Sequence, residues 1–140
     1  MTDDTAESRG AVLTTLAILM GLLAVSNFMK PVAQAMSPQG TAGFMFFGHR
    51  LHGLANAIIG PLFGVLLASY AFGAWNRRQW VVPLAVAYAI YVILNLILFT
   101  INVPPDENPG VAFALVYSTV AIAVSGGGAI YVLRNRHRLR

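Results

Sequence analysis

The stretch that decides the fold is GLANAIIGPLFGVLLASYAFGA, residues 53–74, which contains no charged side chain. A helix needs about 20 mostly apolar residues to cross the roughly 30 Å of hydrocarbon in a bilayer. Working outward from this stretch, three further segments meet the requirement, at about 11–29, 81–101 and 110–132. The sequence therefore predicts four membrane-spanning helices.

The composition supports an integral membrane protein. The chain is 57% hydrophobic and 10% charged, whereas soluble domains are about 45–50% apolar and about 25% charged. Pro104 and Pro105 end the third span, because tandem prolines cannot continue a helix. We predict an all-α fold, a four-transmembrane-helix bundle forming a single integral membrane domain over residues 1–140. The longest connection contains FMFF (44–47), which we expect at the membrane interface or at the start of a long second helix.

The distribution of Lys and Arg predicts the orientation. With the N-terminus inside, the outer side carries only Lys30 and Arg50, and the inner side carries Arg9, Arg77, Arg78, Arg134, Arg136, Arg138 and Arg140. Cytoplasmic loops of membrane proteins are enriched in these cations. We therefore expect both termini in the cytoplasm and the acidic pair Asp106-Glu107 outside. The expected location is a plasma membrane or a bacterial inner membrane.

Both ends of the chain allow a second interpretation. Ala33-Gln34-Ala35 resembles a signal-peptide cleavage site, but the acidic N-terminus and the long apolar run favour an uncleaved first helix. The C-terminal RNRHRLR is interpreted as an inner-leaflet anchor, with a specific site for acidic lipid or nucleic acid as the alternative. Because orientation already explains the basic residues, we expect no nucleic-acid partner.

Small residues follow one face of the second predicted span. They recur at intervals of three and four residues, which places them on one side of a helix: Gly53, Ala57, Gly60, Gly64, Ala68 and Ala71. Gly60 and Gly64 form a GxxxG motif, which lets membrane helices pack closely. We expect an internal packing face, and a seam for a second copy or a partner helix is the alternative.

Polar side chains gather toward the outer half of the predicted bundle. The spacing of His49, His52 and Asn56 predicts one helical face, and Arg50 is rotated about 100° away from it. Similar spacing groups Tyr88, Tyr91 and Asn95 in the third span and Tyr117 with Ser125 in the fourth. Asn56, Asn95 and Tyr117 are expected roughly 5–11 Å below the outer boundary. We predict an outward-facing polar cavity with His49, Arg50 and His52 at its mouth and Asn56, Tyr91, Asn95 and Tyr117 lining it.

His49-Arg50-Leu51-His52-Gly53 resembles a motif at a membrane helix in two protein groups. In cytochrome b-type anchor subunits of succinate dehydrogenase a similar HRxxG borders a quinone site, and heme A synthases carry one next to haem. This chain departs from the anchor subunits, which have three spans and carry the motif before the first. Haem is the less favoured interpretation, because His49 and His52 would share one helix face and His137 lies at the other membrane side. A purely interfacial role, with these side chains capping the helix and reaching headgroups, is the simplest alternative.

Catalytic signatures are missing from the sequence. It has no HExxH, P-loop or GxSxG motif, no cysteine, and no carboxylate inside a predicted span. We therefore expect no enzyme, no catalytic residue and no metal site.

Two longer segments, GLLAVSNFMKP and GPLFGVLLASYAFGAWNRRQWVVPLAVAYA, resemble the DoxX-like group of small four-helix membrane proteins. The likeness covers roughly residues 13–100, with a lysine ending the first helix and a basic turn ending the second. It implies a four-helix bundle associated with a membrane redox or quinone-linked system, and it transfers no catalytic residue.

The sequence thus supports three hypotheses for function. The first is a non-catalytic accessory subunit that holds a quinone or a lipid-like molecule in the outer cavity. The second is a scaffolding protein that docks a partner helix on the GxxxG face, and the third is a b-haem redox protein. Expected partners are membrane lipids and either a membrane protein or a second copy of the chain.

Overall fold

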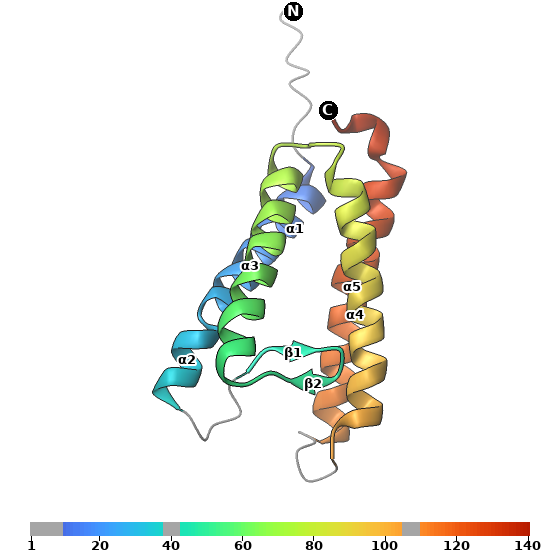
Figure 1. Ribbon diagram of the computed structural model, residues 1–140. Coiled ribbons are helices and arrows are strands. Elements are labelled where there is room, and N and C mark those ends of the chain that lie inside the picture. Colours follow the sequence, from blue (N-terminus) through green and yellow to red (C-terminus); the bar gives the residue numbers. More distant parts are fainter. Residues whose placement is uncertain (1–9, 38–42, 105–109) are drawn as a thin grey trace, which may run out of the picture.

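The computed structural model describes residues 10–37, 43–104 and 110–140, and long helices dominate it (Figure 1). They are α1 (Ala11–Phe28), α3 (Gly53–Trp75), α4 (Val81–Asn102) and α5 (Val111–Arg134). By length and composition, these four of the described helices can cross a membrane, as a multi-pass membrane protein requires. Their bounds agree with the predicted spans to within two residues.

The connection between α1 and α3 contains a short helix, α2 (Lys30–Met36), and a hairpin of β1 (Met45–Phe46) and β2 (His49–Arg50). Residues 45–50 are called the hairpin below. Its two turn residues, Phe47 and Gly48, have φ angles of 47° and 78°, the left-handed region that tight two-residue hairpin turns require. FMFF therefore does not begin a long second helix, because the chain reverses direction there and α3 begins only at Gly53.

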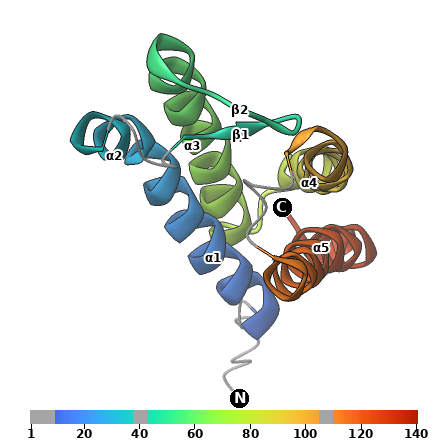
Figure 2. The ribbon, with the colours of Figure 1, turned by 90° about the horizontal axis from the view of Figure 1, so that it is seen from below.

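The long helices form two pairs. α1 packs along α3, and α4 packs along α5. At one end of the molecule, called the hairpin end, the hairpin crosses from the start of α3 to α4 (Figures 1 and 2). The start of α1 and the end of α5 lie together at the opposite end. The pairs are thus joined at their two ends.

Close packing of α1 on α3 depends on the GxxxG motif. A Cβ added to Gly64 would lie 3.2 Å from the carbonyl oxygen of Ala24, and one added to Gly60 would lie 3.4 Å from that of Asn27. Both glycines are buried, so this face packs inside the chain. Gly53 and Ala57 are exposed, so the packed part of this face begins at Gly60.

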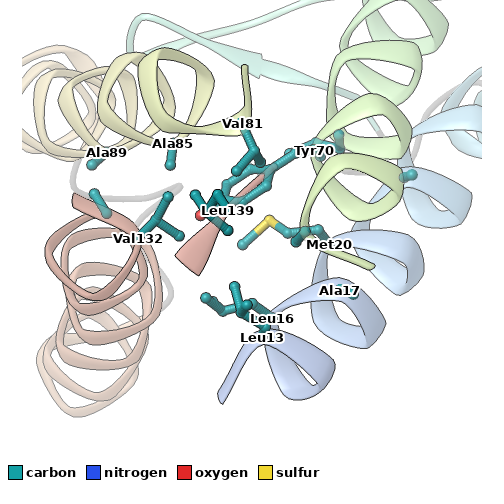
Figure 3. Packing of buried hydrophobic residues seen from close by; sticks show 14 residues of the cluster. Leu13, Leu16, Ala17, Met20, Tyr70, Val81, Ala85, Ala89, Val132 and Leu139 are labelled. Atoms are coloured by element: carbon teal, nitrogen blue, oxygen red, sulfur yellow. The ribbon is translucent and has the colours of Figure 1, made fainter. Parts of the chain in front are cut away.

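The largest buried cluster lies where the two pairs meet, away from the hairpin. Met20, Tyr70 and Val81 are each 0% exposed, and Figure 3 shows them beside Val132 and Leu139. Since these residues come from α1, α3, α4, α5 and the C-terminal segment, the cluster joins all four long helices.

Backbone hydrogen bonds hold the C-terminal segment against the loop between α3 and α4. The Arg140 N–H donates to the Arg77 carbonyl at 2.6 Å, and the Gln79 N–H donates to the Arg140 carbonyl at 2.9 Å. These bonds bring Leu139 into the core and gather the cations of three segments at one end: Arg77, Arg78, Arg134, Arg136, Arg138 and Arg140. We call it the arginine end.

Gly64→Leu is expected to separate α1 from α3, because the new side chain meets the Ala24 backbone and the Phe28 ring. Overpacking of this kind costs about 1–3 kcal/mol. Thermal unfolding in mild detergent would show a lower midpoint for this variant. Gly21→Leu is the matched control, because a Cβ there meets nothing within 4 Å, and equal effects of the two variants would contradict the packing.

Candidate functional site

A cavity of about 510 Å³ lies between the two helix pairs. All four long helices contribute to its walls, and Gly43, Phe44 and Met45 close it toward the hairpin. Small-molecule sites in proteins typically measure about 300–1,000 Å³. The cavity is therefore large enough for one small ligand, and below we call it the cleft.

Aromatic side chains form one wall of the cleft. The ring centroid of Phe63 lies 4.6 Å from that of Tyr91, 5.0 Å from that of Phe44 and 6.2 Å from that of Tyr88. These rings come from α3, α4 and the segment before the hairpin. The other three rings are tilted by 44° to 48° relative to that of Phe63, and together the rings give the cleft an aromatic lining suited to an apolar or aromatic ligand.

Polar side chains in the cleft concentrate toward the hairpin end. Ser26 and Asn27 lie in the last turn of α1, Lys30 begins α2, and Asn95 and Tyr117 face them from α4 and α5. The middle of the cleft is lined by apolar side chains that include Leu19, Leu67 and Val124. Along α4, Asn95 is seven residues from Tyr88, a distance of about 10 Å. The cleft thus carries most of its polar side chains toward the hairpin end, whereas its other half holds Tyr88 and Ser125, whose hydroxyl donates to the Ala121 carbonyl at 2.6 Å.

The structure brings together three of the predicted cavity residues. Tyr91, Asn95 and Tyr117 line the cleft. His49, Arg50, His52 and Asn56 lie outside its lining.

The histidines depart from the predicted face for a conformational reason. His49 is in β2, and His52 is extended with φ −128° and ψ 162° before α3 begins. The spacing of His49, His52 and Asn56 therefore does not place them on one helical face. Both histidines are exposed, and Nδ1 of His52 lies 3.5 Å from Nε2 of Gln34.

Asn56 is fully buried and connects three segments by hydrogen bonds. Its Oδ1 accepts from the Phe44 N–H at 2.8 Å. Its Nδ2 donates to Oε1 of Gln34 at 2.7 Å and to the carbonyl of Lys30 at 3.4 Å. This side chain therefore fixes α2 and the start of the hairpin on α3.

Two side chains of α4 hold the other side of the hairpin. The Gly48 N–H donates to Oδ1 of Asn95 at 3.0 Å, and the Tyr91 hydroxyl donates to the Met45 carbonyl at 2.9 Å. Gly48 also packs directly on the backbone of Leu98, where a Cβ would collide. Tyr91 and Asn95 thus line the cleft and position the hairpin. The Nδ2 of Asn95 has no hydrogen-bond partner among the described residues and can donate into the cleft.

Several lining residues were not assigned to the predicted cavity, and three of the polar ones come from the end of α1 and the start of α2: Ser26, Asn27 and Lys30. Their spacing places them on one side of the first apolar run, and Lys30 ends that run as its first charge. That pattern was the feature of the sequence that could have indicated these residues. The helix pair that they face could not be identified from spacing alone.

Within residues 10–37, 43–104 and 110–140, no group of three or more His, Asp or Glu side chains comes together to hold a metal ion. The predicted outer acidic pair, Asp106 and Glu107, lies outside the described residues.

Asn95→Leu is expected to loosen the hairpin. The substitution leaves the Gly48 N–H without its acceptor, and losing one partner of a buried hydrogen bond costs about 1–3 kcal/mol. Hydrogen exchange measured by mass spectrometry would show faster exchange in peptides covering residues 44–50. Asn102→Leu serves as the control on the same helix because Asn102 is exposed. Unchanged exchange in Asn95→Leu would mean that the hairpin does not depend on this bond.

Comparison with known proteins adds no family assignment. No protein-family model, no curated protein and no solved structure matches this chain.

Proposed function

We propose that this protein is a non-catalytic accessory subunit in a membrane and that it binds one quinone or lipid-like molecule in the cleft. The observation that carries the proposal is the cleft itself, a cavity of about 510 Å³ with aromatic walls and a polar end. Ligand sites commonly combine a largely apolar lining with a few polar groups that fix orientation.

Access from the bilayer supports a lipid-soluble ligand. Tyr117 and Val120 line the cleft and are 58% and 55% exposed. The cleft therefore opens to the molecular surface along α5, within a span that is apolar enough to face lipid. A ligand dissolved in the bilayer would enter by this side without crossing water.

The proposed orientation places the hairpin end outside and the arginine end in the cytoplasm. Its support is the gathering of six arginines at the end where α1 starts and α5 stops, since cationic ends of membrane proteins face the cytoplasm. A plasma membrane or a bacterial inner membrane is the proposed location. The cleft then opens in the outer half of the bilayer.

The two other hypotheses receive less support. Gly60 and Gly64 are covered by α1, so a partner helix cannot use that face without displacing α1. For haem, His49 and His52 are exposed and do not line the cleft. The DoxX-like resemblance, with its link to quinone-dependent systems, agrees with the cleft-binding proposal and adds no residue to it.

Ala121→Trp tests the proposal by filling the cleft, because Ala121 is part of its lining. The protein would be purified in mild detergent, and bound quinones and lipids would be extracted and identified by mass spectrometry. We expect the wild-type protein to retain one class of ligand. We expect Ala121→Trp to retain at least about tenfold less of that ligand.

Ala123→Trp is the matched control. Ala123 lies two residues further along α5 and is exposed outside the cleft. This variant should retain the ligand at the wild-type level. The proposal would be overturned if neither the wild-type protein nor Ala123→Trp retained any quinone or lipid-like molecule specifically.

A further inference from the structure

Asn27 is a buried side chain whose hydrogen bonds are only half made. It is 8% exposed, and its Nδ2 donates to the Leu23 carbonyl at 2.8 Å. Because a carbonyl oxygen needs a donor, this bond fixes which end of the amide is the nitrogen and leaves Oδ1 as the other end. That oxygen is buried and has no hydrogen-bond partner within residues 10–37, 43–104 and 110–140. Asn27 therefore holds an unpaired acceptor.

A second buried amide, Asn56, shows how the chain completes such a group. Its Oδ1 accepts from the Phe44 N–H and its Nδ2 donates to Oε1 of Gln34, so both ends of this amide are paired. Buried polar atoms of native proteins nearly always have a partner, either in the protein or in a bound molecule such as water. The oxygen of Asn27 thus calls for a donor that the described residues do not supply.

The position of Asn27 places this missing donor in the cleft. Asn27 lines the cleft, and so does Leu23, one turn earlier on the same face of α1. Because the amide of Asn27 is hydrogen-bonded to the Leu23 carbonyl, it lies along the side of α1 that faces the cleft. A molecule held in the cleft is therefore placed to donate to this oxygen.

Asn95 presents the complementary group from α4. It lines the same cleft, and its Oδ1 is used by the Gly48 N–H at 3.0 Å. Its Nδ2 has no partner in the part of the chain that the structure describes. Toward the hairpin end, the cleft thus offers one free acceptor, on Asn27, and one free donor, on Asn95.

This combination fits a hydroxyl group. A hydroxyl donates one hydrogen and accepts through its lone pairs, so a single group can pair with both amides. Quinone carbonyls, esters and ionised carboxylates only accept, and they would leave Oδ1 of Asn27 unpaired. An ammonium group only donates, and it would leave Nδ2 of Asn95 unpaired.

We propose that the ligand carries a hydroxyl group at the hairpin end of the cleft, where it donates to Oδ1 of Asn27 and accepts from Nδ2 of Asn95. This inference rests on the proposed function and narrows it. Among quinone-type ligands it selects the reduced quinol, and among lipid-like ligands it selects an alcohol. Both sources present the same group, so the experiment must separate them.

The test uses the full chain in nanodiscs of phosphatidylcholine and two matched pairs of probes. Decanol is compared with decyl methyl ether, in which a methyl group replaces the hydroxyl hydrogen. Decylubiquinol is compared with decylubiquinone under anaerobic conditions. Isothermal titration calorimetry measures each affinity, and empty nanodiscs correct for partition into lipid. We expect the wild-type protein to bind the hydroxyl member at least about tenfold more tightly in one of the pairs, and that pair identifies the source.

Asn27→Leu assigns the preference to Asn27. It keeps the size of the side chain and removes the acceptor, so the ratio of the two affinities should fall to about one. A purely structural effect would lower both affinities and leave their ratio unchanged. Asn102→Leu is the matched control, because Asn102 is exposed on α4 outside the cleft lining, and it should keep the wild-type ratio. A preference for the hydroxyl probe that survives in Asn27→Leu would overturn the role of Asn27.

The remaining outcomes separate this inference from the proposed function, and the wild-type ratios decide alone if Asn27→Leu does not fold. Equal binding within both pairs, or tighter binding of decylubiquinone than of decylubiquinol, with binding abolished by Ala121→Trp, would overturn the hydroxyl ligand and leave the cleft as a binding site. Absence of binding for all the probes, together with absence of any co-purified ligand, would overturn both.

Discussion

The fold depends on one constraint. The hairpin lies beside the membrane spans, so protein groups must form hydrogen bonds with its backbone N–H and C=O groups. Gly48 packs on Leu98, four residues and about 6 Å before the end of α4. Non-helical backbone at such a depth is tolerated only when protein groups satisfy it. Asn56, Asn95 and Tyr91 do so for the Phe44 N–H, the Gly48 N–H and the Met45 carbonyl. Because Asn56 belongs to α3 and the other two to α4, the same bonds that satisfy the hairpin also join the two helix pairs.

This arrangement accounts for the cleft. At the arginine end a buried cluster and the C-terminal segment hold the pairs together, and at the hairpin end the hairpin spans them. The cleft lies between these junctions, and its lining combines contacting aromatic rings of α3 and α4 with polar groups near the hairpin. The polar residues of the spans therefore have two tasks. Asn56 is fully used in structure, whereas Asn95 holds the hairpin with its carbonyl oxygen and presents its nitrogen to the cleft.

The sequence predicted the helices well because their signal is local. Apolar length alone placed the four spans, and the spacing of Gly60 and Gly64 indicated the face that α1 covers. Spacing also grouped Tyr91 and Asn95, which do share one wall of the cleft. The hairpin was missed because FMFF is as apolar as a helix start, and its turn depends on Gly48 meeting the α4 backbone. That contact lies 50 residues away in sequence, between Gly48 and Leu98. The prediction treated residues 49–52 as helical and therefore assigned His49 and His52 to one helical face. These residues are not helical in the structure, so the two side chains share no such face.

Whether the hairpin holds the helix pairs in place can be measured directly. The chain has no cysteine, so spin labels can be attached at cysteines introduced for Leu54 and Ile101, which are 75% and 71% exposed near the hairpin end of α3 and α4. Pulsed electron paramagnetic resonance gives the distribution of distances between them. We expect one narrow distribution for the otherwise unmodified chain and a clearly broader one when Tyr91→Phe and Asn95→Leu are combined. An unchanged narrow distribution in the combined variant would contradict this role of the hairpin, because the pairs would then be held apart without the hairpin bonds.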